Sequence, residues 1–311
     1  MYPVLVIGSY NIGLTVMAER IPRPGETVLG TDFIIGPGGK GSNQAITVAR
    51  LGGEVRLLTR IGDDMFGHEA LRLFAREGLT QDTIIIDPQH HTGAGIITVD
   101  ASGQNAISVA LGANLALVPE DLNRVADTML PRGILLVQLE TPLETVCAAI
   151  RRAKESEMTT ILNPAPAQPL PDELYPLIDL LTPNETEAEI LTGIPVSDIE
   201  SAIAAAGILL TRGVQHVVIT LGAQGALWKH REGHTLIPPV LVHAIDTTGA
   251  GDVFSGAIAY ALSCGKALEN ALEFASAAAA FSVTRTGVIT AIPTHTDVKM
   301  MLANVIDGAS L

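Results

Sequence analysis

One segment of the 311-residue chain combines glycines and carboxylates in a way that suits chemistry on an anion. It reads Asp246-Thr247-Thr248-Gly249-Ala250-Gly251-Asp252, follows an apolar stretch and opens a predicted helix. Glycines let backbone N–H groups approach an anion, and the positive end of a helix dipole favours negative charge at that point. No Lys-Ser/Thr pair follows the glycines, so the segment is not a Walker A loop.

Asp252 is the unusual residue of this segment, because a carboxylate in an anion nest repels a phosphate unless it accepts a proton. Taking the proton from an attacking hydroxyl is such a role, since phosphoryl transfer otherwise needs mainly positioning and charge neutralisation. A helix cap and a chain turn explain the same residues equally well. The spacing alone leaves both interpretations open.

A second glycine-rich segment runs from Gly38 to Gln44 and reads Gly-Gly-Lys-Gly-Ser-Asn-Gln. Its glycines permit close approach of a ligand, and Lys40 and Asn43 offer donors to hydroxyl groups. A tight turn from a strand into a helix, with an exposed lysine, would have the same sequence. Taken by itself, this segment favours the turn.

Two further segments have the same ambiguity. Asn184 and Glu187 lie three residues apart at a predicted helix start, where the carboxylate could hold hydrated Mg²⁺ or only cap the helix. The segment 220–225, Thr-Leu-Gly-Ala-Gln-Gly, suits a nucleotide lying on backbone, or a hairpin turn. The pair His90-His91 is expected to lie in a loop and not to bind one metal ion together.

These segments sit within a regular alternation of apolar runs and helical patterns, which is typical of a mostly parallel sheet with helices on both faces. Strands are predicted at residues 4–7, 55–60, 83–86, 134–139, 159–162, 180–182, 216–220, 225–229 and 235–238. Helices are predicted at residues 42–51, 64–77, 119–129, 143–156, 185–191, 199–212, 250–263 and 268–284.

Two segments break this alternation, and we expect them to form a small antiparallel β lid. Residues 11–36 consist of short runs interrupted by prolines and glycines, and residues 93–109 read as a hairpin that turns at 100–103. The sequence contains no repeat and no low-complexity linker, so residues 1–311 are predicted to form one α/β domain that carries this lid.

The composition limits the possible partners. Hydrophobic residues make up 47% of the chain, which is enough for a large core, and the 33 acidic residues exceed the 19 Lys and Arg to give a net charge of −14. This charge disfavours nucleic acids and anionic membrane surfaces as partners. The longest apolar stretch, 253–264, is too short to span a bilayer.

The cysteine content bears on the compartment. Cys147 and Cys264 are too few for a disulfide framework, and we expect both to be small buried apolar residues. A reducing compartment and a cytoplasmic location are therefore predicted.

Taken together, the segments resemble the ribokinase-like (PfkB) family of sugar and nucleoside kinases, from Val4 to about Pro293. Six separated motifs occur in the order of the family, and their agreement favours Asp252 as a base over a simple cap. They are Gly38-Gly39-Lys40-Gly41 with Asn43-Gln44, Gln138-Leu139-Glu140, Asn163-Pro164-Ala165-Pro166, Asn184-x-x-Glu187, Thr220-Leu221-Gly222 and Gly249-Ala250-Gly251-Asp252.

The resemblance implies an ATP-dependent kinase in which Asp252 is the catalytic base and the amides of Gly249, Ala250, Gly251 and Asp252 form an anion hole. The implied sugar site consists of Asn11, Gly13, Gly39, Lys40, Gly41, Ser42, Asn43, Glu140 and Asp252. The implied ATP contacts are Asn184, Thr220, Leu221, Gly222, Ala223, Gln224, Gly225, Gly251 and Ser276.

Two metal ions are also implied by the resemblance. Glu187 would organise Mg²⁺ and the phosphates indirectly. A monovalent cation, K⁺, would sit in a loop site made largely of backbone carbonyls behind the anion hole. The residues of that site are Asp246, Thr248, Ser282, Arg285, Gly287 and Ala291. The family further implies that the β lid can serve as a homodimer interface.

Two positions depart from the family pattern. Members that act on ribose carry Asn-x-Asp after the first strand, where the aspartate binds ribose hydroxyls. This chain has Asn11-Ile12-Gly13 instead. Loss of that carboxylate favours a substrate without a hydroxyl there, or a bulkier one that uses the space. Ala291 stands where a serine hydroxyl often faces the cation, so a weaker dependence on K⁺ is expected.

The sequence therefore predicts transfer of the ATP γ-phosphate to a primary hydroxyl of a pentose or related sugar. A nucleoside kinase of the same family is the first alternative, because Gly13 leaves room for a base. A catalytically silent sugar-binding regulator is the second alternative, although the presence of Asp252 and Glu187 argues against it.

Overall fold

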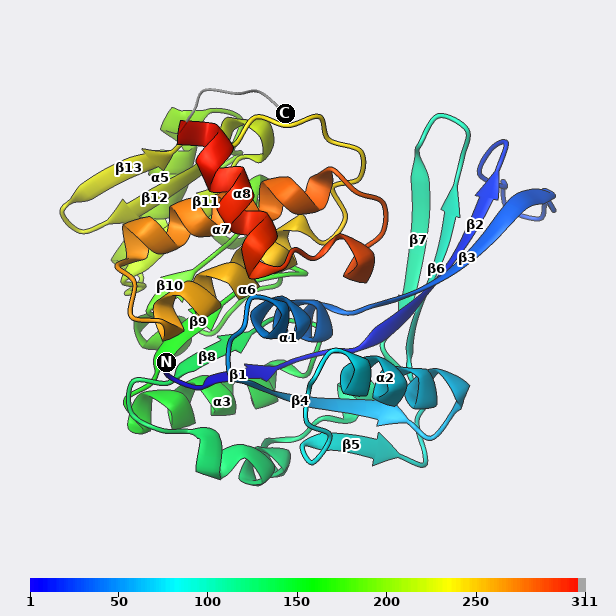
Figure 1. Ribbon diagram of the computed structural model, residues 1–311, viewed down its shortest axis with the longest axis horizontal. Helices are drawn as coiled ribbons and strands as arrows, with labels where there is room; N and C mark the ends of the chain where they lie inside the picture. The colour runs from blue at the N-terminus through cyan, green and yellow to red at the C-terminus, as the bar shows by residue number, and fades with distance from the viewer. Residues whose placement is uncertain (307–311) are drawn as a thin grey trace.

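The computed structural model describes residues 1–306 and contains a nine-stranded sheet flanked by helices (Figure 1). The strand order is β13-β12-β11-β10-β9-β8-β1-β4-β5, and only the pairs β11–β12 and β12–β13 are antiparallel. The strands are β1 (Val4–Ile7), β4 (Val55–Gly62), β5 (Ile84–Asp87), β8 (Ile134–Val137), β9 (Thr159–Leu162), β10 (Leu180–Leu181), β11 (His216–Thr220), β12 (Ala226–His230) and β13 (Gly233–Ile237). The predicted α/β class is confirmed.

Helices cover both faces of this sheet because its central strands are apolar on both sides. In β1, Val4 and Val6 pack into one core cluster, and Leu5 and Ile7 into the other. The helices on the first face are α1 (Lys40–Arg50), α2 (Met65–Arg76), α6 (Ala250–Ser263), α7 (Leu268–Val283) and α8 (His295–Ile306). Those on the second face are α3 (Leu143–Glu155), α4 (Glu185–Thr192) and α5 (Ile199–Thr211).

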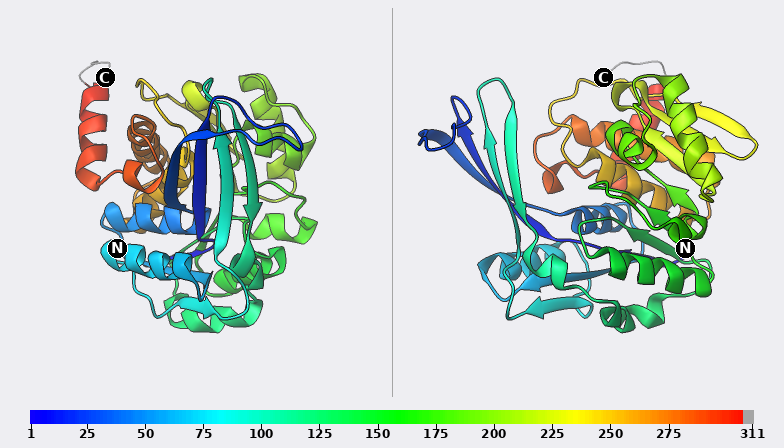
Figure 2. Two further views of the ribbon diagram at one scale, coloured as in Figure 1. Left: turned by 90° about the vertical axis from the view of Figure 1, so that its right-hand side faces the viewer. Right: turned by 180° about the vertical axis from the view of Figure 1, so that it is seen from behind.

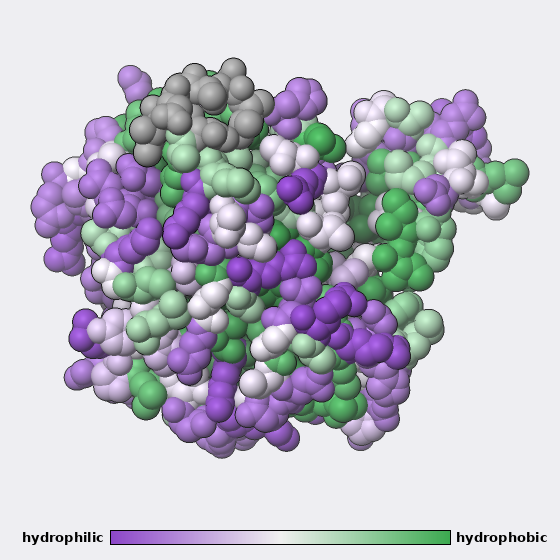
Figure 3. Space-filling model, viewed as in Figure 1, coloured by the Kyte–Doolittle hydropathy of each residue, from purple (hydrophilic) through white to green (hydrophobic). Residues whose placement is uncertain are grey.

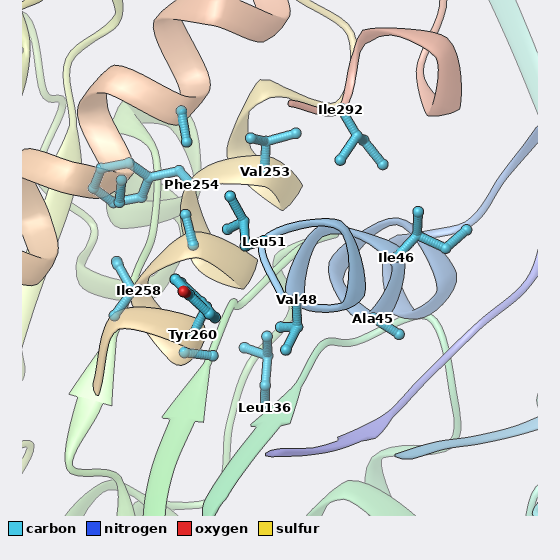
Figure 4. Close-up of a cluster of buried hydrophobic side chains, with 14 of the residues drawn as sticks. Ala45, Ile46, Val48, Leu51, Leu136, Val253, Phe254, Ile258, Tyr260 and Ile292 are labelled. Carbon is cyan, nitrogen blue, oxygen red and sulfur yellow. The ribbon is translucent and has the colours of Figure 1, made fainter. Parts of the chain in front are cut away.

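The first core lies between α1 and α6, whose small residues let the two helices approach closely (Figure 4). Val48 of α1 and Leu51, the C-cap of α1, lie toward Ile258 and Tyr260 of α6 in this cluster, and all four are buried. Gly256 of α6 also faces α1, since a Cβ there would lie 2.8 Å from Thr47 Cβ. This contact fixes the helix that carries Asp252 against the helix that carries Lys40.

A separate four-stranded sheet projects from the body of the molecule (Figure 2). Its order is β3-β2-β6-β7, from β2 (Asn11–Ala18), β3 (Gly30–Gly38), β6 (Gly93–Val99) and β7 (Asn105–Ala110). The two predicted segments thus join in one sheet, in which β2 pairs antiparallel with β3 but parallel with β6. Its action as a lid stays a prediction, as does the single domain over 1–311, of which residues 307–311 lie outside the description.

Some predicted boundaries and environments were wrong. The strand expected at 134–139 ends at Val137, because Gln138 and Glu140 turn to polar partners at the sheet edge. The helix expected at 119–129 is a 3₁₀ helix, η2 (Pro119–Thr128), and α8 was not predicted. Cys147 is buried as expected, but Cys264 is exposed at the end of α6. Among residues 1–306 no helix is long and apolar enough to cross a membrane.

Candidate active site

The carboxyl ends of neighbouring parallel strands place polar side chains along one edge of the large sheet, which is where open α/β sheets bind ligands. Ser9 follows β1, Glu140 follows β8, Asn163 follows β9 and Thr182 follows β10. Thr220 ends β11 and pairs with Asn184 in an isolated parallel bridge. These residues converge below the amino end of α6.

The amino end of α6 is shaped by its glycines. Gly249 is the N-cap with a φ of 80°, and a Cβ there would lie 2.8 Å from Val288 Cγ1. In the described part of the chain, a Cβ built on Gly251 would meet no atom within 4 Å, so the backbone at Gly251 borders open space, whereas the Ala250 N–H donates to the Thr247 carbonyl at 3.3 Å. A cavity of about 150 Å³ opens there, and Gly249, Gly251 and Asp252 contribute to its wall.

Asp252 is buried in the first turn of α6, where two amide side chains hold its carboxylate. Asn43 Nδ2 donates to Asp252 Oδ2 at 2.8 Å, and Gln44 Nε2 donates to Asp252 Oδ1 at 3.0 Å. Burial raises the pKa of Asp252, while the Lys40 ammonium and the two amides oppose that rise and Glu140 adds to it. The carboxylate is therefore oriented, desolvated and more basic than an ordinary aspartate.

Among residues 1–306, Lys40 in the first turn of α1 is the only lysine, arginine or histidine that lines this cavity. Burial works against its charge, but the carboxylates of Asp252, Glu140 and Glu187 outweigh burial and raise the pKa of Lys40. The ammonium group thus stays charged and supplies local positive potential in a chain of net charge −14.

Asn184 and Glu187 cap helix α4 reciprocally at the opposite wall of the cavity. The Asn184 N–H donates to Glu187 Oε2 at 2.9 Å, and the Glu187 N–H donates to Asn184 Oδ1 at 2.8 Å. Burial raises the pKa of Glu187 although the Asn184 N–H and Lys40 oppose it. The capping interpretation is thus confirmed, and Glu187 also lines the cavity.

Glu140 connects two other residues that were predicted to bind the sugar, Asn11 and Lys40. Its Oε2 accepts from Ser9 Oγ, from Asn11 Nδ2 at 3.2 Å and from the Lys40 N–H at 3.1 Å. Asn11 is held on its other side by Asn114 Nδ2, which donates to Asn11 Oδ1 at 2.8 Å. A rigid polar corner therefore forms beside Lys40, where β2 leaves the body of the protein.

Gly13 lies two residues beyond Asn11 on the same face of β2, because side chains alternate along a strand. Its partners in register are Gly36 on β3 and Gly95 on β6. A Cβ on Gly13 would come no closer than 3.4 Å to any atom of the described chain, and a Cβ on Gly36 would meet none within 4 Å. Three glycines thus form a row of bare backbone next to the polar corner, here called the glycine row.

A larger cavity of about 350 Å³ adjoins the amino end of α6 and is predominantly apolar. Its wall includes Thr220, Gly222, Ala223, Gly225, Gly251 and Ser276 of the predicted ATP contacts and Ala250 of the predicted anion hole. Its apolar residues include Val240, Val242, Phe254, Ala279 and Val283. Asn184 lines the smaller cavity instead. Both cavities share Thr220 and Gly251, so a ligand could extend from one into the other.

Asp246 joins two of the predicted cation residues, Thr248 and Gly287. Its Oδ1 accepts from the Thr248 N–H at 2.9 Å and its Oδ2 from the Gly287 N–H at 3.0 Å, which ties two loops together behind α6. Burial opposes this charge, but these bonds lower the pKa of Asp246. Ser282 accepts from the Arg285 N–H through its carbonyl, and Ala291 is buried and offers no hydroxyl.

Several predicted residues do not face either cavity. Leu221 is buried and Gln224 is exposed, and neither lines the apolar cavity. Ser42 turns its hydroxyl to the carbonyl of Gly38 at 2.6 Å. Gly41 is required by packing, since a Cβ there would lie 2.5 Å from the Gly8 carbonyl carbon.

Sequence reasoning missed other members of the site. Ser9 and Asn114 were not singled out, and Gln44, Gln138 and Asn163 were noted in motifs without roles. The last three could have been found, because each is an amide at a strand end or in a glycine-rich turn. Asn114 carries no such local signal, since it lies in the 3₁₀ helix η1 (Gly112–Ala116).

The fold and this arrangement define a class, and comparison with known proteins agrees with it. Residues 1–295 match the model of the "pfkB family carbohydrate kinase". The chain belongs to this family.

Two curated relatives align over most of both chains. The ribokinase of Haemophilus influenzae is 43% identical over 290 residues, which cover 93% of this chain and 95% of the relative. The deoxyribokinase of Salmonella typhimurium is 38% identical over 291 residues, with the same coverage of 93% and 95%.

Two solved structures are similar throughout. The ribokinase of Thermotoga maritima superposes with a TM-score of 0.89 at 38% identity, covering 98% of this chain and 100% of that one. The ribokinase of Arabidopsis thaliana, solved with ribose and ATP, has a TM-score of 0.88 at 32% identity and covers 97% and 99%. These likenesses confirm the predicted family and fold.

Proposed function

We propose that this protein transfers the γ-phosphate of ATP to a primary hydroxyl of a pentose or related sugar, with Asp252 as the base. Membership of the carbohydrate kinase family and the ribokinase relatives support ATP-dependent phosphorylation of a pentose. The observation that carries the residue assignment is the buried Asp252 carboxylate, held by two amides at the wall of a cavity beneath a helix amino end.

The chemistry follows from the positions of the groups. The sugar would lie in the polar corner formed by Asn11, Lys40 and Glu140, with its reacting hydroxyl directed to Asp252. Asp252 accepts the hydroxyl proton as the oxygen attacks the γ-phosphorus, and the bond to the β-phosphate oxygen breaks. The N–H groups of Gly249 to Asp252 and the Lys40 ammonium stabilise the charge on the transferred phosphoryl group.

The nucleotide is proposed to occupy the two joined cavities. Its base would lie in the apolar cavity beside Ser276, Val240 and Val242, and its phosphates would extend toward Gly251 and Asn184. The dominance of apolar lining with few polar groups is typical of small-molecule and cofactor sites. In this arrangement the terminal phosphate of ATP would lie next to Asp252.

Magnesium is proposed to bind mainly to the phosphates. Among residues 1–306 no group of three or more His, Cys, Asp or Glu is clustered as a metal site. Glu187, which already accepts one hydrogen bond, fits a role as a partner of waters around Mg²⁺. When bound, the ion would neutralise phosphate charge.

A K⁺ site is proposed in the loops that Asp246 joins. Both Asp246 oxygens accept backbone N–H groups, so backbone carbonyls near Ser282, Arg285 and Gly287 would supply most of the ligands. Ala291 can offer only its carbonyl oxygen. We therefore expect activation by K⁺, weaker than where a hydroxyl is present.

The identity of the acceptor is proposed to depend on the glycine row. Gly13 offers no carboxylate to a pair of sugar hydroxyls, and Gly36 and Gly95 leave the adjacent backbone bare. A 2-deoxypentose fits this surface, and so does a nucleoside with its flat base on the glycine row, which is the second candidate. A silent regulator fits less well, because Asp252 and Glu187 are both in place at the cavity.

The test is ADP formation by the purified protein with ribose, 2-deoxyribose, fructose and several nucleosides. We expect turnover with a pentose, and the ratio between ribose and 2-deoxyribose identifies the preferred one. Turnover confined to nucleosides would support the second candidate instead. Binding of sugar without ADP formation from any acceptor would contradict the proposed activity.

A homodimer is proposed to form through the projecting sheet. Phe33, Ile35 and Ile96 have exposed fractions of 56%, 52% and 53%, and Figure 3 shows apolar surface along this projection. Large exposed apolar patches commonly mark interfaces. A cytoplasmic location also stays a prediction, since it rests on the two free cysteines.

A further inference from the structure

A buried chain of amide side chains leads from the sheet edge to Asp252. Gln44 Nε2 donates both to Asp252 Oδ1 at 3.0 Å and to Asn163 Oδ1 at 3.2 Å. Gln138 Nε2 donates to Gln44 Oε1 at 2.5 Å. Gln44, Gln138 and Asn163 are each at most 5% exposed, so water cannot replace these partners readily.

The direction of every amide in this chain follows from one backbone carbonyl. The carbonyl of Thr182 can only accept, and Asn163 Nδ2 donates to it at 3.1 Å. Asn163 must then turn its oxygen to Gln44, which obliges Gln44 to present its NH₂ group to both Asn163 and Asp252. The Gln44 oxygen therefore faces Gln138, and the NH₂ group of Gln138 must donate to it.

A flipped Gln44 amide would be costly. Its oxygen would face the Asp252 carboxylate and the Asn163 oxygen, and its NH₂ group would face the NH₂ group of Gln138. Three hydrogen bonds would become three repulsive contacts between buried groups. The Gln138 Oε1 atom lies against Gly8, where a Cβ would come within 2.0 Å of it, and it has no hydrogen-bond partner in the described chain.

We propose that Gln44 is a positioning residue that keeps the Asp252 carboxylate ionised and aimed, and that Gln138 and Asn163 lock Gln44 as a donor. This inference rests on the proposed role of Asp252 as the base. The other charged groups that face Asp252 are Lys40 on α1, Glu140 after β8 and Glu187 on α4. In the described structure Gln44 donates to Asp252 but to neither glutamate, so its loss acts selectively on Asp252.

The test is the pH dependence of kcat/KM for the preferred sugar, whose acid limb reports the base of the free enzyme. Gln44→Met keeps the volume but removes the donor. We expect its acid limb to move upward by about one pH unit, with roughly tenfold lower activity below the midpoint and recovery at higher pH. Gln44→Glu keeps the shape but places an acceptor against Asp252, so the acid limb of the kcat/KM profile should move further upward in this variant.

Two further variants complete the test. In Gln138→Met, Gln44 is still oriented by Asn163, so the acid limb should move upward less than in Gln44→Met. This variant also provides the test if Gln44→Met does not fold. Gln81→Met is the matched control, because Gln81 is exposed and its amide donates to the Leu71 carbonyl outside the site. Its profile should match that of the unmodified protein.

The outcomes separate this inference from the proposed function. An acid limb that stays in place in both Gln44 variants, with activity lowered equally at every pH, would assign Gln44 a purely structural role and overturn the inference. If Asp252→Asn loses turnover in the same assay, the base assignment survives that result. If Asp252→Asn retains turnover, the base assignment fails and the inference fails with it.

Discussion

At the scale of single residues, the site combines one buried base with one half-buried cation. Asp252 and Lys40 lie on different helices, and each shifts the pKa of the other toward the charged form. Both groups line the cavity beneath α6. This pairing explains how a strongly acidic protein can bind an anionic nucleotide at one point of its surface.

Replacing Lys40 tests this electrostatic role. Lys40→Met should lower kcat/KM by roughly 100-fold, because a donor that stabilises developing charge is removed from a desolvated site. The acid limb of the profile should also move upward, since the Lys40 charge opposes the raised pKa of Asp252. Lys299→Met, an exposed lysine of α8, is the control. Unchanged kcat/KM in Lys40→Met would contradict the role of this cation.

The missing carboxylate on β2 can be restored. A Cβ at Gly13 would lie 3.4 Å from the Gly36 carbonyl oxygen and 3.7 Å from Ile97 Cδ1, so a side chain there is tolerated after a small adjustment. Gly13→Asp should raise the ratio of kcat/KM for ribose over 2-deoxyribose by about tenfold or more, because the new carboxylate accepts from sugar hydroxyls. Gly13→Asn is the control of similar size. A ratio that does not change would place the sugar elsewhere.

At the scale of elements, α4 and α2 begin with side-chain caps, whereas α1 and α6 begin at glycines without one. Asn184 and Glu187 cap α4 reciprocally, and Asp64 caps α2 while also holding Thr92 next to β6. Asp64 Oδ1 accepts from the Phe66 and Gly67 N–H groups, and Asp64 Oδ2 accepts from the Thr92 N–H at 2.8 Å. This one side chain therefore joins the body of the protein to the base of the projecting sheet.

Asp64 should contribute stability that depends on pH. Burial acts against its charge, but the bonds from Thr92, Gly67 and Phe66 lower the pKa of Asp64 below its unfolded value. The contribution is therefore present above the unfolded pKa of about 3.9 and is lost as the pH falls through the lower folded pKa.

Chemical denaturation measures this contribution. Asp64→Ala should reduce the free energy of unfolding by about 2 kcal/mol near pH 7, and the difference should shrink toward pH 3. Asp63→Ala, an exposed neighbour, is the control. Equal stability of Asp64→Ala and the unmodified protein at pH 7 would show that the cap is not needed.

The elements could largely be predicted from the sequence, whereas their long-range partners could not. The strands at 159–162 and 216–220 and the helix at 250–263 were predicted with their observed bounds, because apolar runs and glycines mark them locally. The contact of Ser9 with Glu140 joins residues 131 apart, and that of Asn114 with Asn11 joins residues 103 apart. No local pattern encodes such pairs.

Helix α8 shows a local signal that was overlooked. Asp297 Oδ2 accepts from the Thr294 N–H at 2.8 Å and from Thr294 Oγ1 at 2.6 Å, which is the Thr-x-x-Asp pattern of a helix start. The family resemblance was taken to end at about Pro293, and the residues beyond it were left without an assignment. The caps alone would have predicted this helix.

At the scale of the whole molecule, the projecting sheet leaves apolar residues exposed on both of its faces. Ile35 and Ile96 both pair in register with Leu14 and therefore share one face, while Ile34 and Ile107 pair with Thr15 and Ile97 on the other. The second face is the one that carries Asn11 and Gly13. We expect one face to contact a second copy and the other to close over the sugar.

The proposed dimer can be dissociated by charge. Ile35→Asp combined with Ile96→Asp should place two carboxylates in the interface and halve the mass measured by sedimentation equilibrium. Ile190→Asp is the control, because Ile190 on α4 is equally exposed at 53% but lies away from the projecting sheet. An unmodified protein that sediments as a monomer at all concentrations would contradict the dimer.

The central claim is that Asp252 takes the proton from the sugar hydroxyl, and Asp252→Asn tests it most directly. The measurement is the rate of ADP formation with saturating pentose, set beside the affinity for ATP from calorimetry. The account predicts that turnover falls by at least about 1,000-fold while ATP affinity changes little, because Asp252 acts on the acceptor and not on the bound nucleotide. Turnover retained within about tenfold of the unmodified protein would contradict it.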